Sequence, residues 1–189
     1  MEAAFEDGNV SDWTPDGCTS SWGPLYFGGD HGKVYYADLV PAGGCHASLN
    51  NLVPTTNDYR IEADVKIVRE TSGGDHGVMG RASDFNSYYL FYIHADYSDA
   101  GANVPQMMGL LKRVDGQWIS IMQQTTTNIL SNTWYRMAIE FEGSVIRCFI
   151  DGARVYETTD SSINGNKFGL MAMGSGVYFD NVPVIGTMP

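Results

Sequence analysis

The sequence lacks a long apolar run and any excess of basic residues. Of its 189 residues, 22 are Asp or Glu and 11 are Lys or Arg, which gives a formal net charge of −11. Nucleic acids and anionic membranes attract basic surfaces, so this charge argues against both as partners. Without an apolar segment of membrane-spanning length, membrane insertion is not expected. A neutral glycan or a divalent cation is the better expected ligand.

Cysteine is also scarce, with three residues in the chain. Cys18 and Cys45 lie in the glycine-flanked stretches "DGCTS" and "GGCHA", which favours a disulfide between them and a secreted, extracellular protein. Cys148 lies in the strand-like "VIRCFIDG" and is expected to be a buried free thiol. The N-terminus has no basic-then-apolar signal segment, so an exported protein would be present here in its mature form.

No stretch shows the apolar period of a long helix, whereas strict two-residue alternation occurs repeatedly. In "DYRIEADVKIVRE" the apolar set is Tyr59, Ile61, Ala63, Val65 and Ile67, with charged residues between them. In "TWYRMAIEFEG" the apolar set is Tyr135, Met137, Ile139 and Phe141. Each stretch predicts a strand with one buried and one polar face.

Short turn signals separate these stretches, at Asp115-Gly116, Asp151-Gly152, Asn164-Gly165 and Glu142-Gly143-Ser144. Such pairs suit tight hairpins, so consecutive strands are expected to run antiparallel. The sequence therefore predicts one all-β domain over residues 1–189, an antiparallel β-sandwich of two sheets. Trp13 and Trp134 are expected in its core.

From Tyr59 onward the order of several pieces resembles the concanavalin A-like, laminin-G-like jelly rolls. The pieces are "YRIEADVKI", "GVMGRASDFNSYYLFYI", "GLLKRVDGQW", "NTWYRMAIEFEGSVIRCFIDGARVYETTDSSI" and "NKFGLMAMGSGVYFDNVPV", together with the opening "FEDGNVSDW". The resemblance implies two curved antiparallel sheets and a lectin-like role. Related domains are accessory carbohydrate-binding modules of bacterial polysaccharide-degrading enzymes, and some members are hydrolases or lyases.

The resemblance also implies a structural calcium ion (Ca²⁺) where the first and last strands meet. Its expected ligands are Glu6 or Asp7 from the opening and Asp180 from the closing "FDNV", with Asn9 as a weaker candidate. Calcium prefers six to eight oxygen ligands, which such carboxylates and nearby carbonyls would supply. The alternative is that Asp180 forms a turn hydrogen bond and Glu6 is solvated.

Catalysis has weaker support. Jelly-roll glucanases place their acids on one strand as Glu-x-Asp-x-x-Glu, but in "EADVKI" Glu62 and Asp64 are followed by Lys66 and Ile67 where the last acid is needed. These residues are expected to form the polar outer face of a strand. A lyase would instead use Arg81, Tyr88 or Tyr92, and His94, which the acidic charge disfavours.

Two copies of Gly-Gly-Asp-His-Gly occur, around His31 and His76. Each is expected to be a turn in which Asp30 or Asp75 bonds its own backbone. A metal or ligand role for either histidine is the alternative.

A sugar site needs aromatic rings for stacking and planar polar groups for hydroxyls. The predicted ligand-binding residues lie on neighbouring strands and at their ends, with Trp118 or Trp22 as an added stacking surface. They are Arg81, Tyr88, Tyr92, His94, Lys112, Asp75 and His76.

With these residues, the resemblance implies a secreted, non-catalytic module that binds a polysaccharide or oligosaccharide on the concave sheet or end loops, with a parent enzyme or a surface assembly as its partner. The alternatives are a structural or adhesive subunit of a cell-surface or filamentous assembly, and a polysaccharide lyase or glycoside hydrolase.

Overall fold

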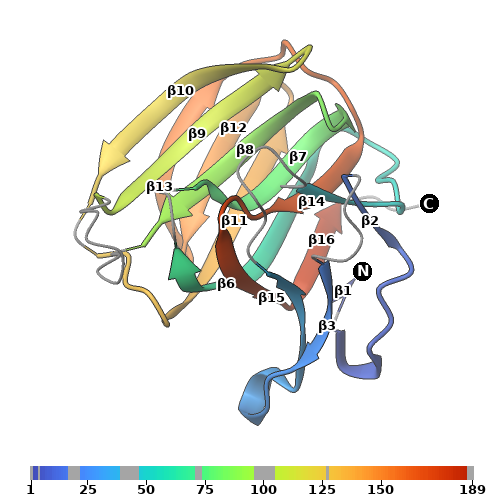
Figure 1. Cartoon of the computed structure of the whole chain (residues 1–189). Coiled ribbons are helices and arrows are strands. Elements are labelled where there is room, and N and C mark those ends of the chain that lie inside the picture. Colours follow the sequence, from blue (N-terminus) through green and yellow to red (C-terminus); the bar gives the residue numbers. More distant parts are fainter. Residues whose placement is uncertain are drawn as a thin grey trace.

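The chain folds into two antiparallel β-sheets packed against each other, as Figure 1 shows for this computed structural model. The structure describes residues 2–3, 5–16, 22–38, 47–70, 74–95, 105–126 and 128–186. The arrangement confirms the predicted all-β sandwich. In the described part of the chain, no helix is long and apolar enough to cross a membrane.

The first sheet has seven strands, and it lies in front in Figure 1. In spatial order they are β10 (Gln117–Thr125), β9 (Met107–Val114), β8 (Ser87–His94), β7 (His76–Asp84), β14 (Lys167–Met171), β5 (Ala47–Asn50) and β2 (Trp13–Pro15). β10 is therefore an edge strand. Its pairing with β9 is interrupted by a register shift between Ser120 and Met122.

The second sheet has nine strands. Its main order is β13 (Ala153–Thr159), β12 (Val145–Ile150), β11 (Trp134–Glu142), β6 (Tyr59–Glu70), β15 (Ser175–Asp180), β4 (Lys33–Ala37) and β3 (Trp22–Tyr26). β16 (Val182–Gly186) pairs with β6 and with β1 (Glu2–Ala3), so the two ends of the chain lie side by side. Two short 3-10 segments, η1 (Phe5–Asp7) and η3 (Gly29–His31), flank this sheet.

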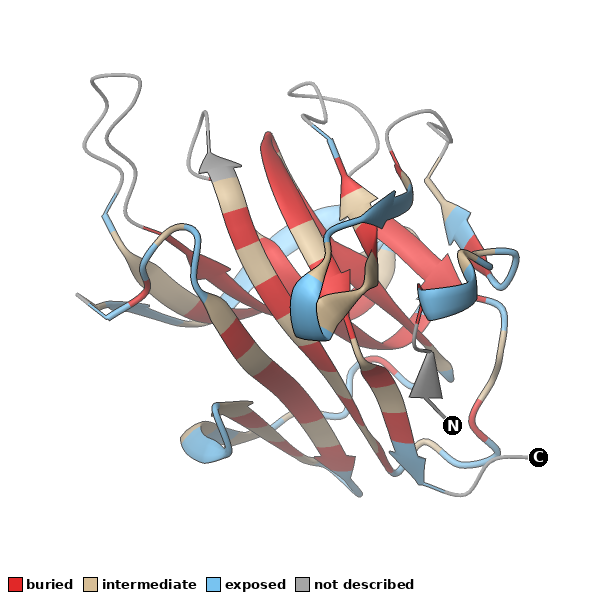
Figure 2. Cartoon of the chain, turned by 90° about the horizontal axis from the view of Figure 1, so that it is seen from below, coloured by how far each residue is buried: buried red, intermediate tan, exposed pale blue. Residues whose placement is uncertain are grey.

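The core lies between the sheets and follows the predicted alternation. In β6 the apolar set from Tyr59 to Ile67 is at most 3% exposed. In β11 the inward residues from Tyr135 to Phe141 are also buried. Burying each large aliphatic side chain contributes about 1.5–3 kcal/mol, so these two strands supply much of the driving force. Figure 2 shows buried stretches along the strands and exposed residues at the hairpin tips.

Two cysteine predictions have different outcomes. Cys148 is a buried free thiol, as expected, and burial raises its pKa. Cys18 and Cys45 lie outside the described residues, so the disulfide stays a prediction.

Three of the four predicted hairpin turns are confirmed. Asp115-Gly116 and Asp151-Gly152 have positive φ at both residues, and Gly143 has φ 54° between β11 and β12. The hairpin predicted at Asn164-Gly165 is wrong. β13 belongs to the nine-stranded sheet and β14 to the seven-stranded sheet, so residues 160–166 cross between the sheets instead of reversing within one.

Asp160 anchors this crossing segment. Its carboxylate accepts hydrogen bonds from the Tyr89 hydroxyl at 2.6 Å and the Ser162 amide at 2.8 Å, and lies 2.6 Å from Lys112 Nζ. Burial opposes ionisation of Asp160, but the bonds from Lys112, Ser162 and Tyr89 outweigh it and hold its pKa well below the ordinary 3.8. The ionised carboxylate therefore joins the end of β13 to β8 and β9.

We expect Asp160→Asn to lower the free energy of unfolding by about 1–2 kcal/mol at neutral pH, because charged hydrogen bonds are lost from a half-buried site. A carboxyl whose pKa is depressed by folding stabilises the protein above its unfolded pKa, and that stabilisation is lost as the pH falls. The difference between variant and wild type should shrink below about pH 3.8.

Urea unfolding at neutral and acid pH measures this difference. Asp115→Asn is the matched control, because Asp115 is exposed at a turn where Asn serves equally well. Equal destabilisation by Asp160→Asn at both pH values would contradict an ionic role for Asp160.

Candidate functional site

Strand β8 places three predicted site residues on the outer face of the seven-stranded sheet. Tyr88, Leu90 and Tyr92 belong to a buried cluster on that face, whereas Tyr89 and Phe91 belong to the core between the sheets. His94 continues the outer set, because its ring lies 5.2 Å from that of Tyr92. The predicted alternation of residues 88, 90, 92 and 94 is confirmed.

Strand pairing extends this face in rows across β8, β9 and β10. One end row is Tyr88, Arg113 and Trp118, and the next is Leu90, Leu111 and Ser120. The third row is Tyr92, Gly109 and Gln123, and the last is His94, Met107 and Thr125. The six-residue step from Tyr88 to His94 spans about 20 Å along the strand.

Asp75 and His94 form a hydrogen-bonded pair at one end of these rows. His94 Nε2 lies 2.8 Å from Asp75 Oδ1, with the two side chains 10% and 20% exposed. An ionised carboxylate only accepts hydrogen bonds, so Nε2 donates the proton and Nδ1 of the neutral ring keeps its lone pair. The pair therefore holds a histidine whose second nitrogen can bond to a ligand.

Tyr92 lies beside this pair, and the position of its ring depends on the absence of a side chain at Gly109. A Cβ atom on Gly109 would lie 2.3 Å from Tyr92 Cζ, so the phenol ring covers the glycine. Burial and then the charge of Asp75 raise the pKa of Tyr92 to about 12. Its hydroxyl stays protonated at neutral pH and can donate a hydrogen bond.

Tyr88, Arg113 and Trp118 form a second polar and aromatic group at the other end. The Arg113 guanidinium lies 4.9 Å from the Trp118 ring centroid, and the Tyr88 and Trp118 rings meet edge to face at 6.0 Å. Arg113 also donates to the turn carbonyls of Phe85 and Gly116. Burial raises the pKa of Tyr88 to about 12, although the hydrogen bond and charge of Arg113 oppose the shift; Asp16 and Asp75 make smaller contributions.

The structure does not bring Arg81 or Lys112 to this face. Arg81 is 2% exposed, and its guanidinium donates to the carbonyls of Asn57 and Gly143 and stacks on Phe141. Lys112 faces the opposite way and pairs with Asp160. Both side chains support the sandwich near its interior.

His76 lies near the candidate site without reaching the surface. It is fully buried, its ring is 6.5 Å from that of His94, and its Nδ1 accepts the Met173 amide. The second Gly-Gly-Asp-His-Gly copy is therefore not the predicted turn, because Asp75 bonds His94 and His76 begins β7. The first copy does form a tight turn, η3.

Sequence reasoning missed Arg113 and selected its neighbour Lys112. A signal for Arg113 was available in the Asp115-Gly116 turn. A two-residue hairpin loop pairs Val114 with Gln117, and therefore Arg113 with Trp118. The turn thus fixes which of the two basic residues shares a face with Tyr88.

The sequence matches a known family, described as the 3-keto-alpha-glucoside-1,2-lyase-like domain, over residues 1–185. The chain belongs to this family. Comparison with curated proteins gave no match.

Several solved structures share the fold of this 3-keto-alpha-glucoside-1,2-lyase-like domain. Carbohydrate-binding module CBM66 from Bacillus subtilis is 22% identical, with TM-score 0.68, covering 93% of this chain and 96% of the other. Domain 4 of AbnA, a GH43 arabinanase from Geobacillus stearothermophilus, is 15% identical, with TM-score 0.62 and coverages of 99% and 91%. A GH16 endo-glucanase from Bacteroides ovatus is 12% identical, with TM-score 0.69 and coverages of 98% and 99%. These likenesses confirm the concanavalin A-like jelly roll.

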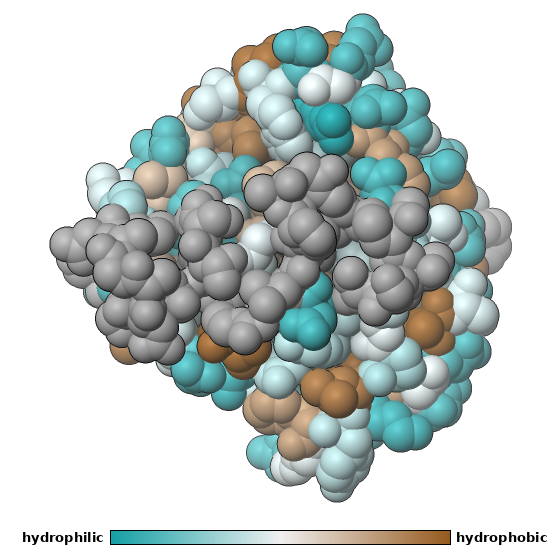
Figure 3. All heavy atoms as spheres, viewed as in Figure 1, coloured by the Kyte–Doolittle hydropathy of each residue, from teal (hydrophilic) through white to brown (hydrophobic). Residues whose placement is uncertain are grey.

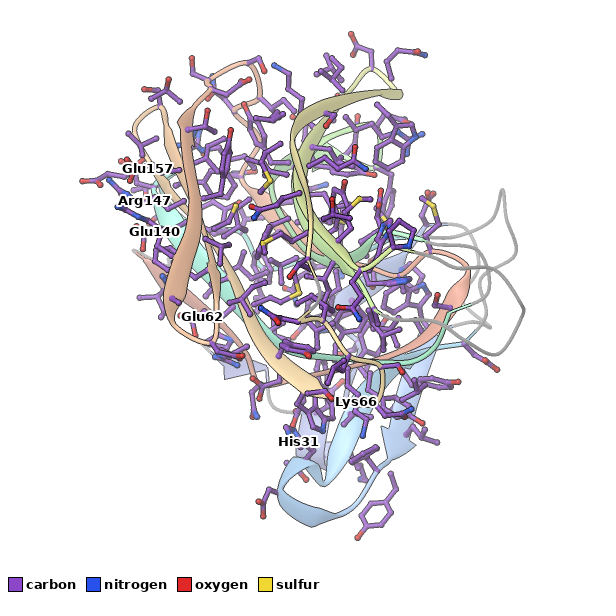
Figure 4. All side chains as sticks on the ribbon, turned by 90° about the vertical axis from the view of Figure 1, so that its left-hand side faces the viewer. His31, Glu62, Lys66, Glu140, Arg147 and Glu157 are labelled. Atoms are coloured by element: carbon purple, nitrogen blue, oxygen red, sulfur yellow. The ribbon has the colours of Figure 1, made fainter. Side chains whose placement is uncertain are left out.

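The outer face of the nine-stranded sheet has a different chemistry, dominated by ion pairs. Figure 4 shows Glu157, Arg147, Glu140 and Glu62 following one another across it, and Arg147 lies within 2.9 Å of both Glu140 and Glu157.

Glu62 and Asp64 lie 2.9 and 3.1 Å from Arg136. Burial opposes ionisation of Glu62, but bonds from Arg60 and Arg136 outweigh it and lower its pKa. Glu62 and Asp64 are thus outer-face residues held by arginines, as expected, and Lys66 and Ile67 follow them where the glucanase pattern needs its last acid.

Trp134 also lies on this outer face, so its prediction as a core residue is wrong. The alternation that turns Tyr135 inward turns Trp134 outward. Its ring stacks on His31 with centroids 3.9 Å apart, at the end of the face where Figure 4 labels His31 and Lys66. Trp13 is buried in the core, as predicted.

The acidic residues predicted to bind calcium lie near the joined chain ends but have different partners. Glu6 accepts the Lys33 amide, and Asp7 accepts the Asn9 amide at 2.7 Å. Asp180 is 1% exposed, its Oδ2 lies 2.9 Å from His31 Nδ1, and its Oδ1 has no hydrogen-bond partner among the residues that the structure describes.

Within the described ranges, no three His, Cys, Asp or Glu side chains converge as metal ligands. Among the predicted calcium ligands, Asp180 therefore supplies one buried carboxylate oxygen, Oδ1, that could bind a cation.

Proposed function

We propose that this chain binds a carbohydrate, in the first place a glucoside, on the outer face of β8, β9 and β10. The observation that supports this most directly is the Asp75–His94 pair beside Tyr92. Together they offer a carboxylate acceptor, an imidazole nitrogen and a protonated phenol next to an aromatic ring. Sugars present hydroxyls and apolar ring faces, so this set matches both. The family description favours a glucoside over other sugars.

We propose in the first place that the chain is a non-catalytic binding module. Similarity to CBM66 and to domain 4 of an extracellular arabinanase supports a binding role alongside a larger enzyme. The ligand is expected to be neutral, since the chain is acidic. Among the residues that Figure 3 colours, most are hydrophilic and the hydrophobic ones form separate patches. A secreted location is part of this proposal and depends on the predicted Cys18–Cys45 disulfide.

The binding proposal predicts that Gly109→Ala and His94→Gln weaken binding of methyl α-glucoside and maltose. The added methyl group displaces Tyr92, and the glutamine removes the ring nitrogen that faces the ligand. Each loss is expected to be about tenfold, the effect of one hydrogen bond or ring contact. Titration calorimetry measures it.

Gly23→Ala is the control, because a Cβ atom there meets nothing within 4 Å. Melting temperatures of all three variants distinguish lost binding from lost folding. Wild-type protein that retains none of these sugars, or variants that bind as tightly as wild type, would contradict the proposed site.

The same geometry supports a lyase as a second candidate function. A 1,2-lyase acting on a 3-keto-glucoside removes the C2 proton, which the adjacent C3 ketone makes acidic. The C1–O bond then breaks, the C1=C2 bond forms, and the leaving oxygen takes up a proton, so no oxidant or reductant is required. His94 Nδ1 would be the base, with Asp75 holding Nε2–H, while Tyr92 stays a proton donor.

This candidate predicts that the protein converts 3-keto methyl α-glucoside into an enone that absorbs in the ultraviolet. Asp75→Asn and His94→Gln should lower kcat by about 10²–10⁴, the usual contribution of a general base. Tyr26→Phe, at an exposed residue of β3 in the other sheet, should retain activity. No enone from the wild-type protein would leave the binding module as the function.

We also propose that a calcium ion at the joined chain ends uses Asp180 Oδ1, with carbonyl and water oxygens completing its ligands. The support is a buried carboxylate oxygen for which the described part of the chain supplies no hydrogen-bond partner, a costly arrangement unless something satisfies it. Glu6 and Asp7, with their backbone partners, are no longer the first candidates.

The calcium proposal predicts a higher melting temperature when calcium is added after treatment with chelator. Calcium at 100 times its Kd should stabilise the folded state by about 2.7 kcal/mol. Asp180→Asn should abolish the response, whereas Asp7→Asn should keep it. A wild-type melting curve that ignores calcium would refute the site.

A further inference from the structure

Trp118 is exposed to an unusual degree for a tryptophan held in place by its neighbours. It is 44% exposed, whereas Trp13 and Trp22 are each 6% exposed in the core. The ring nevertheless has fixed contacts, with Tyr88 against it edge to face and the Arg113 guanidinium over it. Its solvent-facing surface is therefore pre-ordered, and little conformational entropy is lost when a second ring stacks on it.

Arg113 differs from the other arginines whose side chains the structure describes. Arg60, Arg81, Arg136, Arg147 and Arg154 each pair with a carboxylate. Among the residues that the structure describes, Arg113 has no carboxylate within 4 Å, although acids outnumber bases two to one. Two of its N–H groups bond turn carbonyls, so the guanidinium is fixed while donors remain for a ligand.

The Trp118 group and the Asp75–His94 pair share one face but are too far apart for a single sugar ring to touch both. Trp118 lies on β10 in the row of Tyr88, and His94 lies on β8, two strands away. Along the strand direction, the rows of Tyr88 and His94 are six residues, or about 20 Å, apart. Leu90 and Leu111 form an apolar floor between them.

From this arrangement we infer that the ligand is an elongated glycoside, and that Trp118 with Arg113 forms a second subsite for a ring remote from the Asp75–His94 pair. This rests on the proposed binding function and specifies the size of its substrate. The remote ring stacks its apolar face on Trp118 and presents a polar group to Arg113. A further sugar unit and an aromatic aglycone share this chemistry.

The test compares ligands of increasing length on the full chain. The neutral series is methyl α-glucoside, maltose, maltotriose and maltotetraose, and 4-nitrophenyl α-maltoside represents the aromatic aglycone. Wild-type affinity should rise about tenfold once the ligand reaches Trp118. Trp118→Ala should remove that gain and leave affinity for the shortest ligand unchanged, whereas Trp118→Phe should keep most of it.

Ile119→Ala is the matched control. Ile119 is the next residue of β10, is 42% exposed and lies on the opposite face. It should leave the length dependence intact. Ligand-induced change in tryptophan fluorescence, present in wild type and absent in Trp118→Phe, assigns the contact to this ring and distinguishes it from a structural role.

The outcomes separate this inference from the function on which it rests. If no ligand of either series binds the wild-type protein, the proposed function fails. If short ligands bind but Trp118→Ala leaves the length dependence unchanged, the second subsite alone is overturned. A Trp118→Ala effect on self-association, with ligand affinity unaffected, would assign the ring to a protein contact and also overturn it.

Discussion

The two-residue alternation of β8 is the constraint on which both the core and the candidate site depend. Tyr89, Phe91 and Ile93 fill the space between the sheets, while Tyr88 and Tyr92 face outward among other buried residues. A register slip of one residue would exchange these sets and turn the outward hydroxyls toward the core. Because both sets are large and closely packed, such a slip would be costly, and the outer rows are held accurately.

The two outer faces of the sandwich differ in what a ligand would have to displace. On the nine-stranded sheet, arginines and acids already satisfy one another, and a ligand would have to compete with charged hydrogen bonds. On the seven-stranded sheet, apolar and aromatic residues separate the Asp75–His94 pair from Arg113, which has no carboxylate partner among the described residues. Sugar rings displace water from such surfaces at lower cost. This contrast favours the seven-stranded sheet as the binding face.

Much of the fold was predictable, because alternation and turn chemistry are local. The buried set of β6 and the turns at Asp115-Gly116 and Asp151-Gly152 follow from short stretches, whereas the meeting of the chain ends was implied by the family resemblance. The shared face of Tyr88 and Tyr92 follows in the same way. The predictions that were wrong concerned contacts between segments that lie far apart in the sequence. A turn signal at Asn164-Gly165 does not reveal that the next strand joins the other sheet.

The site was predictable only in part, for the same reason. Arg81 and Lys112 were chosen because they lie near the tyrosines in sequence, but Gly143 and Asp160 fix where they point. Asp75 and His94 were both predicted as ligand-binding residues, but no local sequence pattern indicates that they contact each other. The disulfide between Cys18 and Cys45 and the calcium ion stay predictions.

The bulge in β10 has a consequence for how the protein behaves in solution. β10 is a nine-residue edge strand without a charged residue or proline, the kind of edge that invites another chain to add a strand. Between Ser120 and Met122 the bulge breaks the regular spacing of its ladder and increases the local twist. A second chain could therefore pair with only a short segment of β10 on either side of the bulge, and not with the whole strand. This irregularity allows the molecule to leave an uncharged, aromatic edge open to solvent while resisting aggregation.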